Sequence, residues 1–528
     1  MSGAADFPEV GAGATDETFT VARNVSTRYV AVAVEVVLGI VILPFNLAHL
    51  GQSAYGLWML TASVTAYFSI LDLGYGGALV KFVAQCRARR DAGALNEILS
   101  TVFVVFFTFG VVTYLAAVAI TIYIGQLFHL TPEQVHTGRL VMLIISLSVA
   151  VGTAVSPFGA VINGFQRYDL NNLVGSAAAL VIAAVNVVVL LMGYGLVVLV
   201  AATTAVRLLS YVVYRANAYR VFPGLQMRFG LFRRERLREV TSLSVYMLLI
   251  DWANKLNYSI DALVIGAFLD TSAIAVWIVG QRLAELSQRL TNQLNDVLFP
   301  TVVDNDTSDR LHRLRAILIQ GTRLSLATVI PIGGAMMLMA RPLVEAWVGH
   351  GFGVSVVVLQ VLSLTVIVRI GAATAGTLLK GAGEHRLVAF ANVAAAVVNV
   401  AVSIAIVRRL GLVGVALGTL VPVALASLLI IFPAGCRRVE IPLAHGIAEA
   451  VWPAVWPAAA MAAFIYATRG FVPVSLFAVG AEMAAACGVY AVVFVAFGLS
   501  RDERHFYWAK TSDLLQRAWL PIRVSEGA

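Results

Sequence analysis

Apolar residues fill most of the chain in runs long enough to cross a lipid bilayer. A helix needs about 20 apolar residues to span the hydrocarbon region, and the pattern predicts fourteen such helices joined by short polar connections. We therefore expect an all-α polytopic membrane protein. The predicted spans cover residues 26–47, 56–80, 97–124, 139–160, 172–192, 195–214, 242–268, 273–299, 318–339, 354–378, 387–407, 411–432, 451–468 and 473–498.

Composition supports the membrane assignment and excludes other classes. The 528 residues are 60% hydrophobic and 12% charged, whereas about a quarter of the residues in soluble domains are charged. The net charge of +8 comes from short basic runs between apolar segments, so no domain for binding nucleic acid is expected. Cys86, Cys436 and Cys487 have neither metal-ligand spacing nor the pattern of a disulfide framework. We expect small apolar thiols there, no metal and no cofactor.

The distribution of Lys and Arg predicts the topology. Residues 1–22 lack the basic start and apolar run of a cleavable signal, so the first span is expected to direct insertion. Basic residues gather in alternate connections, and such connections face the cytoplasm. Both termini are therefore predicted to be cytoplasmic, in the plasma (inner) membrane of a bacterium. The pair Arg408 and Arg409 falls on the predicted outer side and has no explanation in this scheme.

Short sequence echoes predict an internal duplication. The partners lie 219, 217, 213 and 216 residues apart, and a near-constant spacing indicates two copies of a six-helix unit. Six is even, so the copies share one orientation, with a pseudo-two-fold axis along the membrane normal. The echoes start at Leu50 and Leu269, at Asn163 and Lys380, at Val185 and Val398, and at Gly195 and Gly411.

The duplication divides the chain into six predicted parts. Two six-helix bundles are joined by a basic linker, and two additional helices follow the second bundle. The parts are a disordered cytoplasmic tail over 1–24, the N-terminal bundle over 25–216, the basic cytoplasmic linker over 217–240, the C-terminal bundle over 241–435, two additional transmembrane helices over 436–500 and an interfacial cytoplasmic tail over 501–528.

Two neighbouring predicted spans carry stripes of polar residues. A charge at mid-bilayer costs about 2.5–3.5 kcal/mol, so faces with several charges are expected to line protein or a watery cavity. The helical spacings i, i+3, i+4 and i+7 put the members of each stripe on one face. In span 242–268 the stripe is Asp251, Asn254, Lys255, Tyr258 and Asp261, and in span 273–299 it includes Arg282, Glu285, Gln288, Arg289 and Asn292.

Cations on the stripes and on two other spans predict an anionic cargo. Arginine binds phosphate through a bidentate fork, so we expect a diphosphate site formed by some of Arg282, Lys255, Arg289, Arg369 and Arg207. Asn254, Tyr258, Gln288 and Asn292 are then expected to line the cavity and contact sugar. The alternative is structural ion pairing: Asp251 with Lys255, and Glu285 with Arg282 or Arg289, have helical spacing for it. Arg28 and Arg323 are expected to snorkel to the interface.

Buried carboxylates raise the question of energy coupling. A carboxyl group in a partly dry cavity has a raised affinity for a proton and can exchange it, or a sodium ion, as the cavity opens to each side. The candidates for proton or sodium coupling are Glu35, Asp72, Asp251, Asp261 and Glu285. Ion pairing or helix capping is the alternative, above all for Asp72. Glu482 is assigned to packing.

Three segments resemble a known family. LGQSAYGLWMLTASVTAYFSILDLGYGGALVKFVAQ from Leu50, DALVIGAFLDTSAIAVWIVGQRL from Asp261 and LLKGAGEHRL from Leu378 are similar to polysaccharide transporters, the Wzx-type oligosaccharide-lipid flippases. Their superfamily also holds multidrug and toxin extrusion (MATE) antiporters and lipid II flippases. The resemblance implies transfer of a polyprenyl-diphosphate-linked glycan to the outer leaflet by alternating access. It also implies a role in lipopolysaccharide or exopolysaccharide synthesis beside a polymerase and glycosyltransferases.

Rival functions predict different polar residues. A membrane glycosyltransferase or polymerase usually needs catalytic carboxylates in an outer loop, but the longest predicted outer connection, 125–138, holds one carboxylate, Glu133. We therefore expect no enzymatic activity. A multidrug or cation antiporter would favour an acidic cavity, whereas the stripes lean cationic. A lipid II flippase would need the same diphosphate-binding cations and remains an alternative.

Overall fold

The chain folds into α-helices joined by short connections, in a computed structural model that describes residues 14–68, 75–241, 260–307, 310–471, 473–499 and 503–504. These residues include no β-strand. They divide into two compact units: the first takes those within Met1–Ile278 and Asn392–Gly418, and the second those within Val279–Ala391 and Thr419–Ala528. The predicted domain boundaries, including those at 217 and 241, stay predictions.

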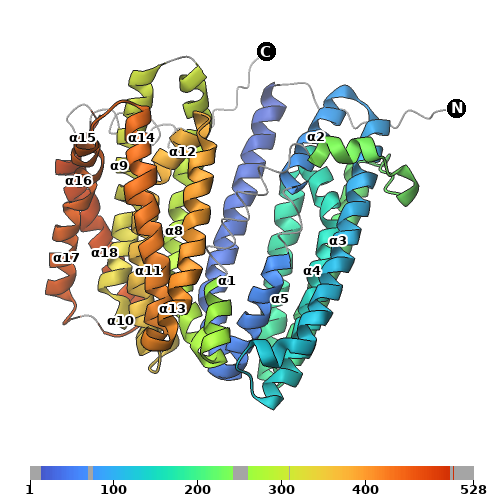
Figure 1. Cartoon of the computed structure of the whole chain (residues 1–528), viewed down its shortest axis with the longest axis horizontal. Helices are drawn as coiled ribbons and strands as arrows, with labels where there is room; N and C mark the ends of the chain where they lie inside the picture. The colour runs from blue at the N-terminus through green and yellow to red at the C-terminus, as the bar shows by residue number, and fades with distance from the viewer. Residues whose placement is uncertain are drawn as a thin grey trace, which may run out of the picture. The chain divides into compact units, whose positions relative to one another are not determined.

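Helix α4 is the centre of the first unit. It packs against α2, α3, α5 and α6, while α1 packs mainly against α5, and the long pair α3 and α4 can be followed side by side in Figure 1. The helices are α1 (Ala14–Phe68), α2 (Tyr75–Arg89), α3 (Ala92–Leu127), α4 (Pro132–Gly164), α5 (Tyr168–Leu191), α6 (Leu196–Val221) and the 3-10 turn η2 (Phe229–Leu231), followed by helical residues 234–241 and 260–268.

Helix α9 has the corresponding place in the second unit, where it packs against α11, α12, α16, α17 and α18. The remaining elements include three short π-helical stretches, labelled η3, η4 and η5. The elements from α8 onward are α8 (Thr271–Thr307), α9 (Leu311–Leu338), α10 (Ala340–Val348), α11 (Gly353–Gly371), α12 (Ala373–Gly381), α13 (His385–Leu425), η3 (Ala426–Ile431), α14 (Phe432–Arg438), α15 (Leu443–Gly446), η4 (Ile447–Val451), α16 (Trp452–Val455), α17 (Pro457–Thr468), α18 (Leu476–Val493) and η5 (Phe494–Gly498).

Ten helices in the described part are long and apolar enough to cross a membrane. Two of them are broken by a glycine in the left-handed region, Gly51 (φ 75°) in α1 and Gly411 (φ 56°) in α13, so each joins two helices. Helix α8 is long enough, but its polar stripe keeps it out of the ten. The all-α polytopic membrane fold is confirmed, and the number fourteen stays a prediction because most of span 242–268 lies outside the described residues.

The two segments of one predicted echo end their helices in the same type of turn. Between α4 and α5 the Arg167 amide donates to the Ile162 carbonyl over 3.0 Å, and between α12 and α13 the Glu384 amide donates to the Leu379 carbonyl over 2.8 Å. The residue before each donor is left-handed, Gln166 with φ 61° and Gly383 with φ 82°. This is the hydrogen-bond pattern of a Schellman helix end. The two turns are 217 residues apart.

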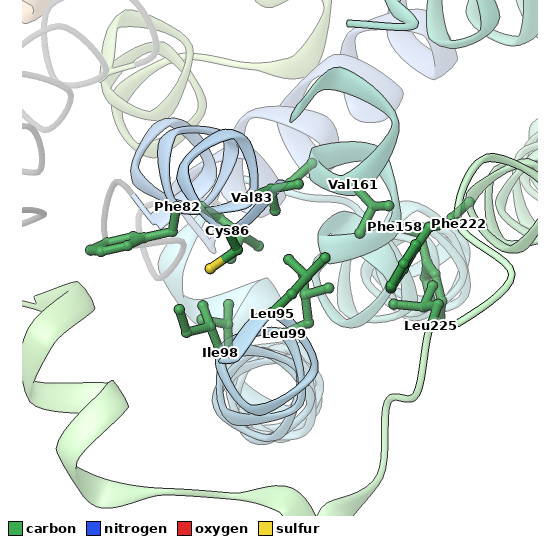
Figure 2. Close-up of a cluster of buried hydrophobic side chains, with 14 of the residues drawn as sticks. Phe82, Val83, Cys86, Leu95, Ile98, Leu99, Phe158, Val161, Phe222 and Leu225 are labelled. Carbon is green, nitrogen blue, oxygen red and sulfur yellow. The ribbon is translucent and has the colours of Figure 1, made fainter. Parts of the chain in front are cut away.

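A buried apolar cluster closes one end of the first unit. Figure 2 shows Cys86 of α2 near Leu95 and Leu99 of α3, and Phe222 from the segment after α6 beside Phe158 of α4. Cys86 lies in this cluster as a free, buried thiol. Burial, with a smaller contribution from Asp91, raises its pKa above the ordinary thiol value. The expectation of a small apolar thiol is confirmed for Cys86.

Candidate functional site

A polar pocket of about 410 Å³ lies within the first unit, between α2, α4, α5 and α6. Its wall contains amide and phenol side chains, which are unusual among helices that are otherwise so apolar. Glycine residues on α4 leave the space that these side chains occupy. The pocket is lined by Val80, Gly152, Val155, Ser156, Gly159, Ala160, Asn163, Asn171, Tyr211 and Tyr214.

Asn171 organises the polar wall from the first turn of α5. Its side-chain nitrogen donates to the Gly159 carbonyl at 3.0 Å and to Asn163 Oδ1 at 2.7 Å, and the Tyr214 hydroxyl donates to its backbone carbonyl at 3.4 Å. The Asn171 Oδ1 atom is buried and has no hydrogen-bond partner. A buried acceptor without a donor costs free energy, and a ligand hydroxyl would satisfy it.

Tyr211 forms the opposite wall one turn before Tyr214 on α6. Its hydroxyl donates to the Ser148 carbonyl at 3.3 Å. Gly152 makes this placement possible, because a Cβ there would lie 2.5 Å from the Tyr211 oxygen. The pocket therefore presents two phenols and two amides, which suit a neutral polyhydroxy ligand better than a charged one. Arg207, predicted on the same stripe as these tyrosines, is exposed on α6 and does not line the pocket.

The second unit contains three of the predicted diphosphate-binding cations. Arg282 on α8 is about half exposed (48%), and its Nη1 lies 3.6 Å from Glu285, whose side chain is 25% exposed. Gln281 also donates to Glu285, at 2.7 Å. The ion pair weighed from the spacing thus forms between Arg282 and Glu285, but it leaves much of the guanidinium accessible. Arg289 is exposed farther along α8, and the partly buried Arg369 is in the last turn of α11.

The predicted coupling carboxylates lie in different environments. Asp261 is 4% exposed and lies within electrostatic range of the Tyr67 phenol on α1, whereas Glu35 is exposed on α1. Gln288 is partly buried on α8. Asn292 is also on α8, in a part where side chains are not described. Asp72, Asp251, Asn254, Lys255 and Tyr258 lie outside the described residues.

Two ionic side chains are buried in the second unit, and one of them differs from the prediction. The sequence predicts snorkelling for Arg323, but its side chain is only 12% exposed and its Nη1 lies 2.7 Å from Glu503. Its Nε donates to the Glu449 carbonyl at 2.9 Å, so Arg323 connects α9 to η4 and to Glu503 within the second unit. Glu482 on α18 is 6% exposed, and the Thr468 hydroxyl donates to its Oε1 at 2.6 Å. Glu482 Oε2 has no hydrogen-bond partner.

Comparison with known proteins places these observations in context. Residues 49–357 match the model of a family described as polysaccharide biosynthesis protein. The chain is 22% identical over 418 residues to a protein of Haloferax volcanii named probable flippase AglR, covering 77% of this chain and 82% of that one.

Two solved structures show the same fold. The lipid II flippase MurJ in an inward closed conformation has a TM-score of 0.69 at 15% identity, covering 88% of this chain and 97% of that chain. A multidrug resistance MATE family transporter of the MOP superfamily, in an inward-facing conformation, has a TM-score of 0.60 at 17% identity, covering 78% and 94%. The helical fold is therefore of the MurJ and MATE type. Because the family model spans more than half of its residues, the chain belongs to the polysaccharide biosynthesis protein family.

Proposed function

We propose that the protein is a flippase that moves a polyprenyl-diphosphate-linked oligosaccharide from the cytoplasmic to the outer leaflet by alternating access, for the synthesis of a cell-surface polysaccharide. The family match over residues 49–357 is the observation that carries this proposal. The relative named probable flippase and the fold shared with MurJ support it. Moving a lipid between leaflets breaks no covalent bond, so the proposal includes no enzymatic activity.

The polar pocket is proposed to contact sugar. Asn171 Oδ1 offers an unused buried acceptor, and Asn163, Tyr211 and Tyr214 supply the other polar groups of the wall. Such groups bind hydroxyls without needing a counter-charge. Asn254, Tyr258, Gln288 and Asn292 stay proposed as further sugar contacts on the two striped helices.

The diphosphate is proposed to bind the predicted cations, with Arg282 of the second unit first among them. Arg282 shares its charge with one partner, Glu285, at 3.6 Å, and it remains half exposed. A guanidinium in this state can exchange a carboxylate for a phosphate, which accepts the same bidentate hydrogen bonds. Lys255, Arg289, Arg369 and Arg207 complete the proposed set.

Energy coupling is proposed to use proton or sodium exchange at carboxylates. Asp261 is the strongest candidate because it is almost fully buried, and burial penalises the charged form of a carboxyl group. Glu285 would couple exchange to diphosphate binding through Arg282. Glu35, Asp72 and Asp251 remain the other candidates. The proposed location is a bacterial inner membrane with both termini cytoplasmic, beside a polymerase and glycosyltransferases.

A reconstituted transport assay tests the proposal. Proteoliposomes would carry a fluorescent polyprenyl-diphosphate oligosaccharide. A glycosidase added outside the vesicles would cleave glycan only after it reaches the outer leaflet, so the cleavage rate reports the rate of transfer. Charged hydrogen bonds contribute about 1.5–3 kcal/mol, so Arg282→Gln should slow transfer roughly 10- to 100-fold. Arg282→Lys should recover part of the rate. Arg409→Gln, an exposed arginine outside the proposed set, is the matched control.

The outcomes separate the rival functions. Transfer of the oligosaccharide lipid no faster than in protein-free liposomes would refute the proposed function. Equal rates for Arg282→Gln and Arg409→Gln would refute the diphosphate role of Arg282 while leaving the function intact. Preferential transfer of lipid II over the oligosaccharide lipid would favour the lipid II alternative, and export of a cationic dye would favour the multidrug antiporter.

A further inference from the structure

A long apolar groove of about 540 Å³ lies on the first unit, and Val155 of α4 lines both this groove and the polar pocket. Phe103, Phe107 and Leu115 of α3 form one wall, and Leu147 and Val151 of α4 form the other. From Phe103 to Leu115 the groove follows twelve residues of α3, about 18 Å at 1.5 Å per residue. One leaflet of the hydrocarbon region is about 15 Å thick, half of about 30 Å. The groove is therefore as long as one leaflet.

The segment after α6 folds back and covers one end of the groove. We call residues 222–236 the strap. Asn96 of α3 donates to the Gly224 carbonyl at 2.9 Å and accepts from the Gln226 amide at 2.9 Å. Ser100 donates to the Gln226 carbonyl at 3.1 Å and accepts from the Arg228 amide at 3.2 Å. The strap is thus hydrogen-bonded along the start of α3 and is not a loose linker.

Aromatic rings and cations meet at the strap end of the groove. The Phe229 ring, 59% exposed, lies 5.7 Å from Phe103 and 5.6 Å from Phe107 in edge-to-face contacts. Arg215 of α6 lines the groove, and its guanidinium lies 5.8 Å from the Tyr219 ring. Arg228 on the strap is exposed beside Phe229. The predicted topology puts this end at the cytoplasmic surface, where anionic headgroups of the inner leaflet lie.

We propose that the groove binds one hydrocarbon chain of an anionic phospholipid of the inner leaflet, with the headgroup phosphate at Arg215 and the strap. The apolar walls match a chain in length, and the cations at one end match the charge of the headgroup. Exposed aromatic rings beside arginines are typical of the membrane interface. Val155 is the one residue that the two linings share, and the proposed occupant of the groove is a resident lipid that holds the strap against α3.

Native mass spectrometry tests the site with defined lipids. The full chain would be released from bilayers of phosphatidylglycerol and phosphatidylcholine in equal amounts, and the retained lipids would be counted. Wild-type protein should retain phosphatidylglycerol preferentially. Val111→Trp fills the groove, and Val112→Trp is its matched control, because both valines are exposed on α3 but only Val111 lines the groove. Arg215→Gln is likewise matched by Arg220→Gln on the same helix.

Val111→Trp and Arg215→Gln should each lower the retained phosphatidylglycerol about fivefold, as expected for one lost contact near an anionic surface. The two control variants should match wild type. Equal retention by Val111→Trp and Val112→Trp would overturn the groove assignment, and equal retention of both lipids by wild type would overturn the headgroup assignment. Displacement of phosphatidylglycerol by added polyprenyl phosphate would make the groove a substrate site and overturn the proposal. Arg215→Gln tests the site even if a tryptophan variant fails to fold.

Discussion

Replacing Asn96 with Ala should loosen the strap on α3, where Ser100 still bonds to it. The amide of Asn96 makes two hydrogen bonds to strap backbone, one to Gly224 and one from Gln226, each 2.9 Å long. Each bond contributes about 0.5–1.5 kcal/mol, so the variant should lose about 1–3 kcal/mol of local stability. A tenfold change in an equilibrium constant corresponds to about 1.4 kcal/mol. The strap should therefore open roughly 5- to 150-fold more often.

Hydrogen exchange followed by mass spectrometry measures this opening directly, since amides exchange through local unfolding. Peptides covering 224–233 should exchange faster in Asn96→Ala, while peptides from α5 should be unchanged. Thr108→Ala is the control, because Thr108 is on the same helix but bonds only to the Val104 carbonyl. If strap exchange in Asn96→Ala stays within twofold of that in Thr108→Ala, the strap is held by something other than these bonds, and the reasoning fails.

Three further predictions concern packing and buried groups. Gly110→Ala should destabilise the protein by about 1–3 kcal/mol, because the added Cβ would lie 2.5 Å from a backbone carbonyl of α4. Gly480→Ala should instead stabilise the protein by about 0.5–1 kcal/mol, because nothing lies within 4 Å of the added Cβ. Thermal unfolding in detergent measures both variants, and equal shifts of the midpoint would contradict the close packing at Gly110. Cys86 should react slowly with iodoacetamide at pH 8, because its raised pKa keeps the thiol protonated and burial shields it, and mass spectrometry should find full reaction only after denaturation. Glu482→Gln should keep the thermal midpoint of wild type, because the amide oxygen can still accept from Thr468; a loss above about 3 kcal/mol would show that a charge is required there.

The membrane fold could be predicted from the sequence because the bilayer imposes it. Only helices with all their backbone groups paired can cross the hydrocarbon region, so apolar runs of the right length indicate helices almost directly. Even the helix breaks match the predicted spans, since Gly51 lies between two of them and Gly411 is the first residue of span 411–432. The echo at Asn163 and Lys380 stays a prediction of duplication, although both segments end their helices in the same turn.

The polar sites were harder to predict because they depend on contacts between distant residues. Tyr211 and Tyr214 share a helical stripe and could be found by periodicity, but Asn171 joins them only because α5 packs beside α6 and the end of α4. The strap shows the same limit. Its basic composition indicated a cytoplasmic linker, and nothing in that composition indicates the hydrogen bonds to Asn96 and Ser100. Arg323 was misjudged for a similar reason, since its partner Glu503 is 180 residues away.

The turns at 162–167 and 379–384 bear on how the predicted duplication can be tested. Their hydrogen bonds join backbone groups alone, so nearly every side chain around them could be exchanged without loss of the turn. Gln166 and Gly383 differ at the one position where glycine is favoured, yet the same turn forms around both. A helix end of this shape therefore leaves little trace in the amino acids, and the predicted duplication is better tested by comparing the backbones of the two predicted bundles than by comparing their sequences.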